Sequence, residues 1–225
     1  MQKIAIITAM KEEAEHVIEK YDLKRMKSLH TLEIYESEEY VLALSGIGKV
    51  QAGIAASYVF LHYNISHCIN IGIAGNLRGD RYKVGDVFFA TKLIQHDIYL
   101  PFGGSHLDYA KKAILLSKQD FPQAQELSFG VYPNGVCLTG DQFIDDSATL
   151  QDLESRYEGD IVEMEAFAIA TTAREYGLLE RLICIKAISD GADSEAKDAH
   201  MDNLDFAMKN SIKVLEKVLH KLTNK

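Results

Sequence analysis

The sequence predicts an α/β fold with a mixed sheet, formed as a single domain by residues 1–225. Short apolar runs typical of buried strands alternate with amphipathic runs typical of helices along the whole chain. No internal repeat, Pro-rich linker or low-complexity segment interrupts this alternation. With 225 residues, of which 47% are hydrophobic and 25% charged, the chain has enough apolar content for one complete core.

The composition also limits the class of partner. The formal net charge is −9, which argues against nucleic acid or an anionic membrane as the main partner. No apolar run approaches the roughly 20 residues needed to cross a bilayer, and the first residues lead into a strand pattern rather than a signal peptide. Cys68, Cys137 and Cys184 lie in separate apolar runs and form no CxxC pair. This pattern indicates reduced, buried thiols. We therefore expect a soluble, cytoplasmic protein.

In the first half of the chain, apolar spacing predicts the elements in order. Met10, Ala14, Val17 and Tyr21 form the core-facing stripe of a helix. The expected elements are strands over 3–8, 67–73 and 83–95, helices over 10–21 and after 49, and a hairpin over 32–45. His96-Asp97 is interpreted as a capped strand end, because no further His or Cys stands at metal-ligand spacing, and no metal is expected.

The second half continues the alternation. Leu100–Gly104 is expected to be a flexible apolar loop, and Asp145 is expected to cap a helix that runs to about Leu153. The polar segment 193–202 is interpreted as a flap. The remaining expected elements are strands over 131–138, 161–163 and 182–189, a helix between the last two of these strands, and helices over 107–116 and 203–222.

Acidic residues are predicted to gather at one end of the sheet, where open α/β sheets bind ligands. Glu163 and Glu165 follow one strand, Asp190 ends another, and Glu13 lies on the flank of the first helix stripe. If residues 163–165 are extended, Glu163 and Glu165 point the same way and Met164 points the opposite way. The alternative reading is that these acids only cap helices, and Glu13 is equally well explained in that way.

This set of side chains suits chemistry on a nucleoside. One carboxylate can bind both hydroxyls of a ribose, while two others on opposite sides of the sugar activate water and protonate the leaving group. Phe143, after a glycine turn at a strand end, would suit stacking on a purine. The SGIGK segment at 45–49 lacks the spacing of a phosphate-binding loop, so a tight turn explains it better. A binding protein would also need Glu and Phe, but Glu13 together with Asp190 favours an enzyme.

The motifs resemble those of the bacterial 5′-methylthioadenosine/S-adenosylhomocysteine nucleosidases, a family of the nucleoside phosphorylase superfamily. The likeness covers nearly the whole chain and rests on ITAMKEE (7–13), SGIGKV (45–50), NIGIAGNL (70–77), KVGDV (83–87), TGDQFI (139–144), VEMEA (162–166) and AISDGAD (187–193). It implies a nucleoside phosphorylase-like three-layer α/β/α sandwich that forms a homodimer. It also implies hydrolysis of the N-glycosidic bond, with release of adenine and a 5-substituted ribose and without a cofactor.

The resemblance implies a role for each matching residue. Glu13 would activate the attacking water, and Asp190, held by Ser189, would protonate purine N7. Glu165 and Met164 would contact the ribose with Glu163 close by, and Lys186 would place a cation beside the ribose and the water. The remaining implied contacts are Phe143 and Ile144 with the base, Met10 and Ile47 as apolar walls, Ala74 and Gly75 as close backbone, and a partner subunit's Leu100–Gly104 loop over the 5′ end.

Three residues depart from the family pattern and leave the substrate range open. Ile73 stands where the family has a small residue, Lys186 where it has Arg, and His200 where it has an aromatic residue. The alternatives are a nucleosidase for AMP or aminofutalosine, a phosphate-dependent purine nucleoside phosphorylase, and an inactive nucleoside-binding protein. Thr8-Ala9-Met10 after the first strand offers no Arg for phosphate, which favours water as the nucleophile.

Overall fold

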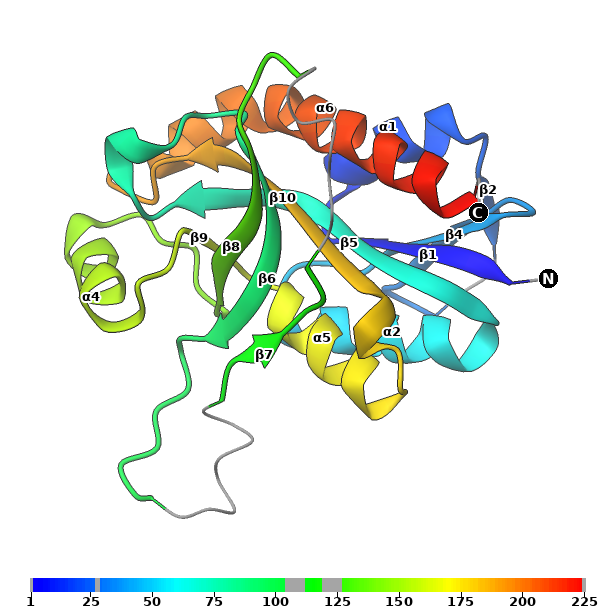
Figure 1. Cartoon of the computed structure of the whole chain (residues 1–225), viewed down its shortest axis with the longest axis horizontal. Coiled ribbons are helices and arrows are strands. Elements are labelled where there is room, and N and C mark those ends of the chain that lie inside the picture. The colour runs from blue at the N-terminus through cyan, green and yellow to red at the C-terminus, as the bar shows by residue number, and fades with distance from the viewer. Residues whose placement is uncertain (1, 27–28, 104–111, 119–126, 224–225) are drawn as a thin grey trace.

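The computed structural model describes residues 2–26, 29–103, 112–118 and 127–223. A mixed sheet runs through the middle of the molecule, with helices on both faces (Figure 1). Its strands are β1 (Lys3–Thr8), β2 (Lys24–Met26), β3 (Glu33–Glu36), β4 (Tyr40–Leu44), β5 (Ile65–Asn76), β6 (Val87–Gln95), β7 (Ile114–Leu115), β8 (Val131–Thr139), β9 (Ile161–Glu163) and β10 (Leu182–Asp190). The helices are α1 (Lys11–Lys20), α2 (Lys49–His62), α4 (Ser147–Tyr157), α5 (Ala166–Glu175) and α6 (Ala196–Thr223).

The three-layer α/β/α sandwich is confirmed by the way β1 divides its side chains between two cores. Ile4 and Ile6 pack on the face covered by α1 and α6, whereas Ala5 and Ile7 pack on the face covered by α2 and α5. This follows from the period of two in a strand. A strand buried on both sides is mostly apolar, which is why Ile4 to Ile7 form a continuous apolar run.

The sheet order brings distant parts of the chain together. The order is β10-β6-β8-β9-β5-β1-β4-β3-β2, and β10 also pairs with β5, so that five strands close into a ring. The pairings of β1 with β4 and β5, and of β5 with β10, are parallel. The ends of β1, β4 and β10 therefore open toward the same edge of the sheet.

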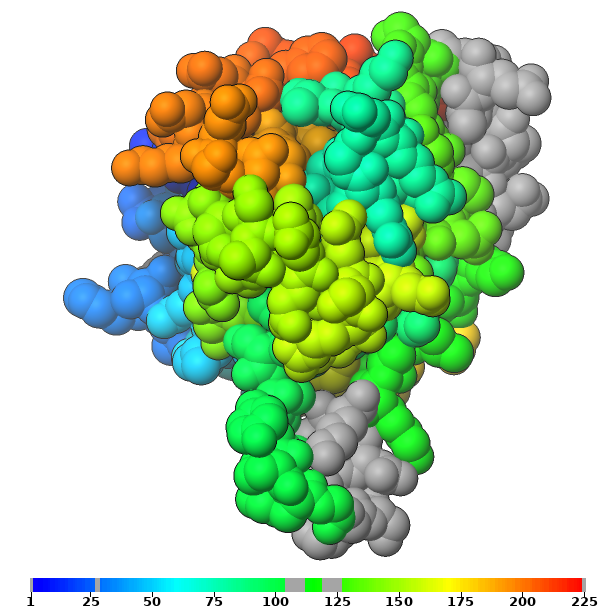
Figure 2. Space-filling model, turned by 90° about the vertical axis from the view of Figure 1, so that its left-hand side faces the viewer, coloured from blue at the N-terminus to red at the C-terminus, as the bar shows by residue number. Residues whose placement is uncertain are grey.

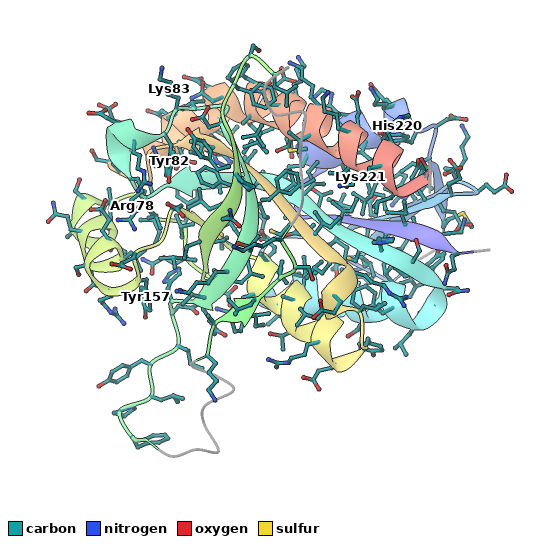
Figure 3. All side chains as sticks on the ribbon, viewed as in Figure 1. Arg78, Tyr82, Lys83, Tyr157, His220 and Lys221 are labelled. Atoms are coloured by element: carbon teal, nitrogen blue, oxygen red, sulfur yellow. The ribbon has the colours of Figure 1, made fainter. Side chains whose placement is uncertain are left out.

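A cluster of aromatic rings stabilises the turn between β5 and β6. Tyr82, labelled in Figure 3, packs edge-on against Phe88 and Tyr132, with ring centroids 4.9 and 4.7 Å away. Its hydroxyl donates a hydrogen bond to Asp160 at 2.8 Å. This bond connects the turn to the residue before β9 and so helps to fix the strand that carries Glu163.

Most predicted elements are present, and four details differ. The edge strand β2 was not predicted, because its KRM sequence is exposed and carries no apolar signal. The cap of α4 is Asp146 rather than Asp145, since its carboxylate accepts the N–H groups of Ala148 and Thr149. Residues 196–202 are not a flap but the polar first turns of α6.

The fourth difference concerns the predicted helix over 107–116. Residues 107–111 lie outside the described part of the chain. Ile114 and Leu115 form strand β7, so the helix prediction is wrong there. Pairing of these two residues with Leu93 and Lys92 of β6 replaces the local helical bonds.

Candidate active site

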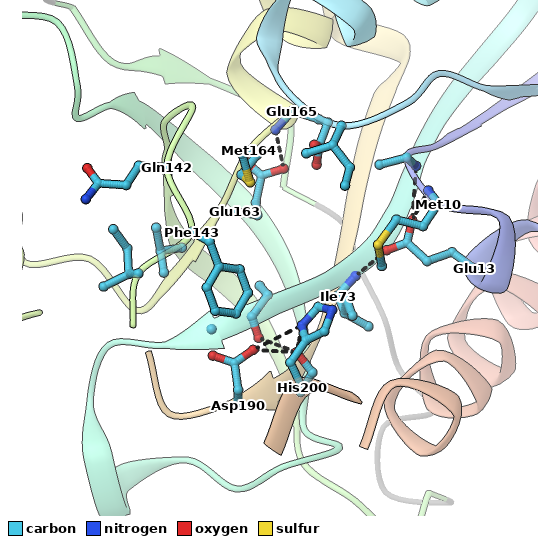
Figure 4. A pocket seen from close by; sticks show the side chains of 17 residues that line it. Met10, Glu13, Ile73, Gln142, Phe143, Glu163, Met164, Glu165, Asp190 and His200 are labelled. Atoms are coloured by element: carbon cyan, nitrogen blue, oxygen red, sulfur yellow. Dashed lines mark hydrogen bonds and ion pairs between the residues drawn. The ribbon is translucent and has the colours of Figure 1, made fainter. Parts of the chain in front are cut away.

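A pocket opens at the edge of the sheet where β1, β4 and β10 end (Figure 4). It contains every predicted site residue except Lys186. The predicted residues that line it are Met10, Glu13, Ile47, Ala74, Gly75, Phe143, Ile144, Glu163, Met164, Glu165, Ser189 and Asp190. Ala9, Gln142 and Val162 also line it and were not predicted, while Ile73 and His200 had been noted only as departures from the family pattern. All three unpredicted residues are neighbours of predicted ones in the sequence.

Glu13 both caps a helix and faces the pocket. Its Oε2 accepts hydrogen bonds from Thr8 Oγ1 at 2.7 Å and from the N–H groups of Ala9 and Met10 at 3.0 Å. Its Oε1 accepts the N–H of Ile73 at 3.1 Å. The helix-capping explanation of this residue is therefore correct, but it does not exclude a chemical role. The capping bonds hold the carboxylate rigidly at the wall of the pocket.

Glu163 and Glu165 do not share one direction, so the prediction of an extended segment is wrong. β9 ends at Glu163, and Glu165 occupies the N-cap of α5. The Glu163 carboxylate turns back to accept the N–H groups of Glu165 and Ala166 at 3.0 and 2.8 Å, and Thr139 Oγ1 at 2.5 Å. Most of its lone pairs are thus occupied by the protein.

Lys186 is buried behind the pocket wall and pairs with Glu163, with 2.9 Å between Nζ and Oε2. Burial alone would raise the pKa of Glu163, but the charge of Lys186 and the hydrogen bond from Thr139 lower it. Burial would lower the pKa of Lys186, but the charges of Glu163 and Glu165 raise it well above its usual range. Both groups are therefore held ionised.

Gly72 of β5 makes this arrangement possible. A Cβ at this position would lie 2.8 Å from Glu13 Oε1 and 3.3 Å from Lys186 Nζ. The two side chains thus approach each other over bare backbone, which only glycine permits. Lys186, which was expected beside the ribose, is therefore buried and does not line the pocket.

One carboxylate oxygen of Glu165 has no hydrogen-bond partner among the described residues, and the charge of this group is unfavourable. Its Oε1 accepts the N–H of Gly48 at 2.8 Å, which Gly48 presents from a left-handed turn with φ of 94°. Burial, followed by the charge of Glu163, raises the pKa of Glu165 to about 7. A buried carboxylate with spare acceptor capacity is suited to the vicinal hydroxyls of a sugar.

Asp190 is held from both sides at the end of β10. Ser189 Oγ donates to its Oδ2 at 2.7 Å, and the N–H of Ala192 donates to its Oδ1 at 3.0 Å. Ala192 adopts a left-handed φ of 52°, a sparsely populated conformation for a residue with a Cβ. The strained turn fixes the direction of the carboxyl group relative to the pocket.

An aromatic surface lies beside Asp190. The exposed ring of Phe143 meets the ring of His200 edge-on, with 5.4 Å between the centroids. Ile144, next to it, is buried. Figure 4 shows Phe143 between the Asp190 end and the Glu165 end of the pocket, with Glu13 on the far side. A flat heterocycle stacked on Phe143 would therefore reach Asp190 at one edge.

The arrangement can bind a sugar between carboxylates while a base lies against an aromatic ring. No Lys or Arg occurs among the described residues that line the pocket. Within the described ranges, no three His, Cys, Asp or Glu side chains are placed so as to hold a metal ion. The described residues include no helix that is long and apolar enough to cross a membrane.

Residues 3–220 match the model of the phosphorylase superfamily. The chain is 32% identical to a 5′-methylthioadenosine/S-adenosylhomocysteine nucleosidase of Exiguobacterium sp., over 98% of each chain. It is 26% identical to an aminodeoxyfutalosine nucleosidase of Helicobacter pylori, over 99% of this chain and 100% of the relative. Among solved structures, it resembles a 5′-methylthioadenosine/S-adenosylhomocysteine nucleosidase from Neisseria meningitidis in complex with methylthio-immucillin-A. The TM-score is 0.83 and the identity 28%, over 97% of this chain and 99% of that one.

Proposed function

Because the chain belongs to the phosphorylase superfamily, and within it to the 5′-methylthioadenosine/S-adenosylhomocysteine nucleosidases, we propose that it hydrolyses the N-glycosidic bond of 5′-modified adenosines. The products are adenine and a 5-substituted ribose. The observation that carries this proposal is the placement of Glu13 and Asp190 at opposite sides of one pocket, with Glu165 and Phe143 between them (Figure 4). Binding alone does not require two opposed carboxyl groups.

The mechanism assigns one step to each carboxyl group. Asp190, oriented by Ser189, donates a proton to purine N7, which makes adenine a better leaving group. Glu165 accepts hydrogen bonds from the ribose hydroxyls, and Met164 packs beside the sugar. As the C1′–N9 bond breaks, positive charge develops on the ribose and is stabilised by the surrounding carboxylates. Glu13 then takes a proton from the water that attacks C1′.

The pocket supports water rather than phosphate as the nucleophile. A phosphorylase needs cations that can bind phosphate, often as pairs of Arg bonds. Lys186 is already paired with Glu163 beneath the pocket, and Lys49 near its mouth is paired with Asp97 and Asp141. Carboxylates therefore occupy both of these lysines, and neither presents a free ammonium group to the pocket.

A homodimer would complete the pocket. The loop that carries Tyr99 and Phe102 projects away from the body of the molecule, at the lower end of Figures 1 and 2, and these rings are 81% and 60% exposed. Such exposure of two aromatic rings suits burial against a second subunit. The described residues of the Leu100–Gly104 loop do not line their own pocket, so they would close the 5′ end of the partner's pocket. Gly104 lies outside the described residues.

We infer the cellular location from the cysteines. Cys68, Cys137 and Cys184 are buried and free. Burial raises the pKa of each thiol, which keeps all three protonated and unreactive. Free thiols of this kind are typical of the reducing cytoplasm, where we place the enzyme.

The decisive experiment measures adenine release across a panel of adenosines with and without inorganic phosphate. The panel is 5′-methylthioadenosine, S-adenosylhomocysteine, aminodeoxyfutalosine, AMP and adenosine. Release without phosphate, at a rate that phosphate does not raise, is expected for the first two substrates. Aminodeoxyfutalosine is the second candidate substrate, because the chain is similar to the Helicobacter pylori aminodeoxyfutalosine nucleosidase. Strict dependence on phosphate would show that the enzyme is a phosphorylase instead.

Two variants test the assigned roles. Glu13→Gln and Asp190→Asn preserve shape and should each lower kcat by about 100-fold or more, the usual scale for general acid–base groups. Glu12→Gln, at an exposed position next to Glu13, is the matched control and should keep normal turnover. Near-normal turnover in either active-site variant would contradict its assignment.

A further inference from the structure

The two carboxylate oxygens of Glu13 are not equally available to a nucleophile. Three donors bind Oε2, namely the hydroxyl of Thr8 at 2.7 Å and the N–H groups of Ala9 and Met10 at 3.0 Å. Among the described residues, only the N–H of Ile73 donates to Oε1, at 3.1 Å. A carboxylate has about four acceptor sites on its two oxygens. The site that can still take a proton from a nucleophile is therefore on Oε1.

Ile73 stands beside this available oxygen. A Cβ added at the preceding residue, Gly72, would lie 2.8 Å from Oε1, so β5 passes very close to the carboxylate. Along β5, Ile71 and Ile73 point to the face of the sheet that is covered by α1, the helix that carries Glu13. Ile73 lines the pocket together with Glu13, and Figure 4 shows the two side by side. A nucleophile that approaches Oε1 from the pocket must therefore fit beside Ile73.

The Ile73 side chain has little freedom to move aside. The residue is 7% exposed and packs in the core between the sheet and helices α1 and α6. A branched Cβ restricts the rotamers of isoleucine, and close-packed interiors contain few voids. The space beside Oε1 is therefore fixed in size, and its wall on this side is apolar.

We propose that Ile73 is a specificity-determining residue, which admits water to Glu13 and excludes larger neutral nucleophiles such as small alcohols. With either nucleophile, the C1′–N9 bond breaks, its electron pair leaves with adenine, and Asp190 supplies the proton to N7. The oxygen of the nucleophile forms the new bond to C1′ and gives its proton to Glu13. Water yields the free 5-substituted ribose, whereas methanol would yield its methyl glycoside. The two nucleophiles differ by one methyl group, for which Ile73 leaves no room.

This size limit is separate from the charge that disfavours phosphate. No Lys or Arg occurs among the described residues that line the pocket, so a phosphate ion would meet carboxyl groups without a cation. Methanol carries no charge, and its size is what distinguishes it from water at Oε1. The inference rests on the proposed nucleosidase function and concerns the same pocket.

The test is turnover of 5′-methylthioadenosine in mixtures of water and methanol. The measured quantity is the ratio of methyl 5-methylthioriboside to free 5-methylthioribose for the wild type, Ile73→Val and Ile73→Ala. This ratio should rise from the wild type through Val to Ala, by about tenfold or more for Ala, because fitted apolar pockets discriminate methyl-sized differences to that extent. The ratio is set in each turnover, so it does not depend on how much of a variant is folded. Equal ratios in the three proteins would overturn the proposal.

The matched control is Ile71→Ala. Ile71 lies two residues earlier on β5 and faces the same core, but it is not among the described residues that line the pocket. It is fully buried, so its truncation loosens the strand at least as much. This variant should keep the product ratio of the wild type. A rise equal to that in Ile73→Ala would show that loosening β5 is sufficient, and would count against the proposal.

Two other outcomes separate this inference from the proposed function. A higher KM in Ile73→Ala with an unchanged product ratio would make Ile73 a wall for the nucleoside only, and would also overturn the inference. Adenine release would then continue and the proposed function would stand. If the wild type releases no adenine from any nucleoside in water alone, the proposed function fails and this inference fails with it.

Discussion

At the scale of single residues, the fold stabilises the ionised forms of Lys186 and Glu163 at the pocket but disfavours the ionised form of Glu165. Lys186 and Glu163 neutralise each other, and Thr139 and two backbone N–H groups fill the remaining acceptor sites of Glu163. Glu165 has one hydrogen bond from Gly48, and the charge of Glu163 opposes its ionisation. A carboxylate left short of partners is available to bind substrate, and this availability costs stability.

Glu165→Gln should therefore stabilise the protein at alkaline pH while it lowers activity. The pKa of Glu165 is raised from 4.5 to about 7, so its ionisation is harder in the folded than in the unfolded state. The resulting cost is absent below about pH 4.5, grows between pH 4.5 and 7, and is complete above pH 7. Urea unfolding at pH 8 should show a gain of about 1–3 kcal/mol, which disappears near pH 4. The control is Glu175→Gln, at an exposed position, which should change the free energy of unfolding by less than about 0.5 kcal/mol at both pH values. A loss of stability at pH 8 in Glu165→Gln would contradict this account.

Lys186→Met should destabilise the protein by about 3–5 kcal/mol, because it leaves Glu163 buried without a counter-charge. The free energy of unfolding in urea measures this loss. Lys20→Met removes a half-exposed ion pair with Glu216 and should cost about 1 kcal/mol or less. Similar losses in both variants would mean that Lys186 is not paired as described.

At the scale of elements, the loops after β4 and β8 are joined across the mouth of the pocket. The N–H of Lys49, the first residue of α2, donates to Asp141 Oδ1 at 2.7 Å, and its Nζ pairs with Asp97 and Asp141. Asp97 Oδ2 in turn accepts the N–H of Asp141 at 2.8 Å. The joined loops carry Ile47 and Phe143, so these contacts set the width of the slot for the base.

Lys49→Met should mainly raise KM, because the loop that carries Phe143 loses its attachment while Glu13 and Asp190 stay in place. We expect kcat/KM to fall by about tenfold, which corresponds to about 1.4 kcal/mol. Steady-state kinetics of adenine release measure the change. Lys209→Met removes an exposed pair with Asp205 on α6 and should leave both constants unchanged. An equal fall in kcat with no change in KM would place the effect on the chemistry instead.

Elements with strong local signals were predicted well, and those that depend on distant partners were not. The apolar runs of β1, β5 and β10 identify buried strands because nearly every position in them is buried. β7 forms because it pairs with β6, and Asp97 matters because it pairs with Lys49. Both partners lie far away in the sequence, so the neighbouring residues do not reveal either feature. The prediction for Glu163 and Glu165 failed for a related reason, since the turn after β9 depends on hydrogen bonds made by the Glu163 side chain itself.

At the scale of the whole molecule, strand order decides which predicted residues meet. The rule that ligands bind beyond strand ends, together with the resemblance of the motifs, was enough to identify the residues of the pocket. It was not enough to place Lys186, because its pairing with Glu163 depends on the ring of strands in which β10 joins β5 and β6. The contact of His200 with Asp190 likewise depends on the start of α6 at Ala196. The first turns of this helix are polar, so the sequence pattern did not indicate that start.

The exposed face of α2 provides the last prediction, which concerns assembly. Val50, Ile54 and Leu61 lie on one stripe of this helix, and Val50 and Leu61 are 70% and 66% exposed. The stripe begins beside Ile47, a residue of the pocket wall, so a second subunit seated on it would bring its own loop near the pocket. A second copy of the chain suits a stripe that is apolar and uncharged.

Leu61→Glu and Val50→Glu should therefore shift the protein from dimer to monomer, because each places a charge in the proposed interface. Light scattering coupled to size exclusion measures the mass directly. KM for 5′-methylthioadenosine should rise in the monomer, because the monomer would lose the partner's loop that we propose covers the 5′ end. Met26→Glu, at an exposed apolar position on edge strand β2, should leave both the mass and KM unchanged. A dimer that survives both substitutions on α2 would place the interface elsewhere, and a dimer lost without any change in KM would exclude the loop from the pocket.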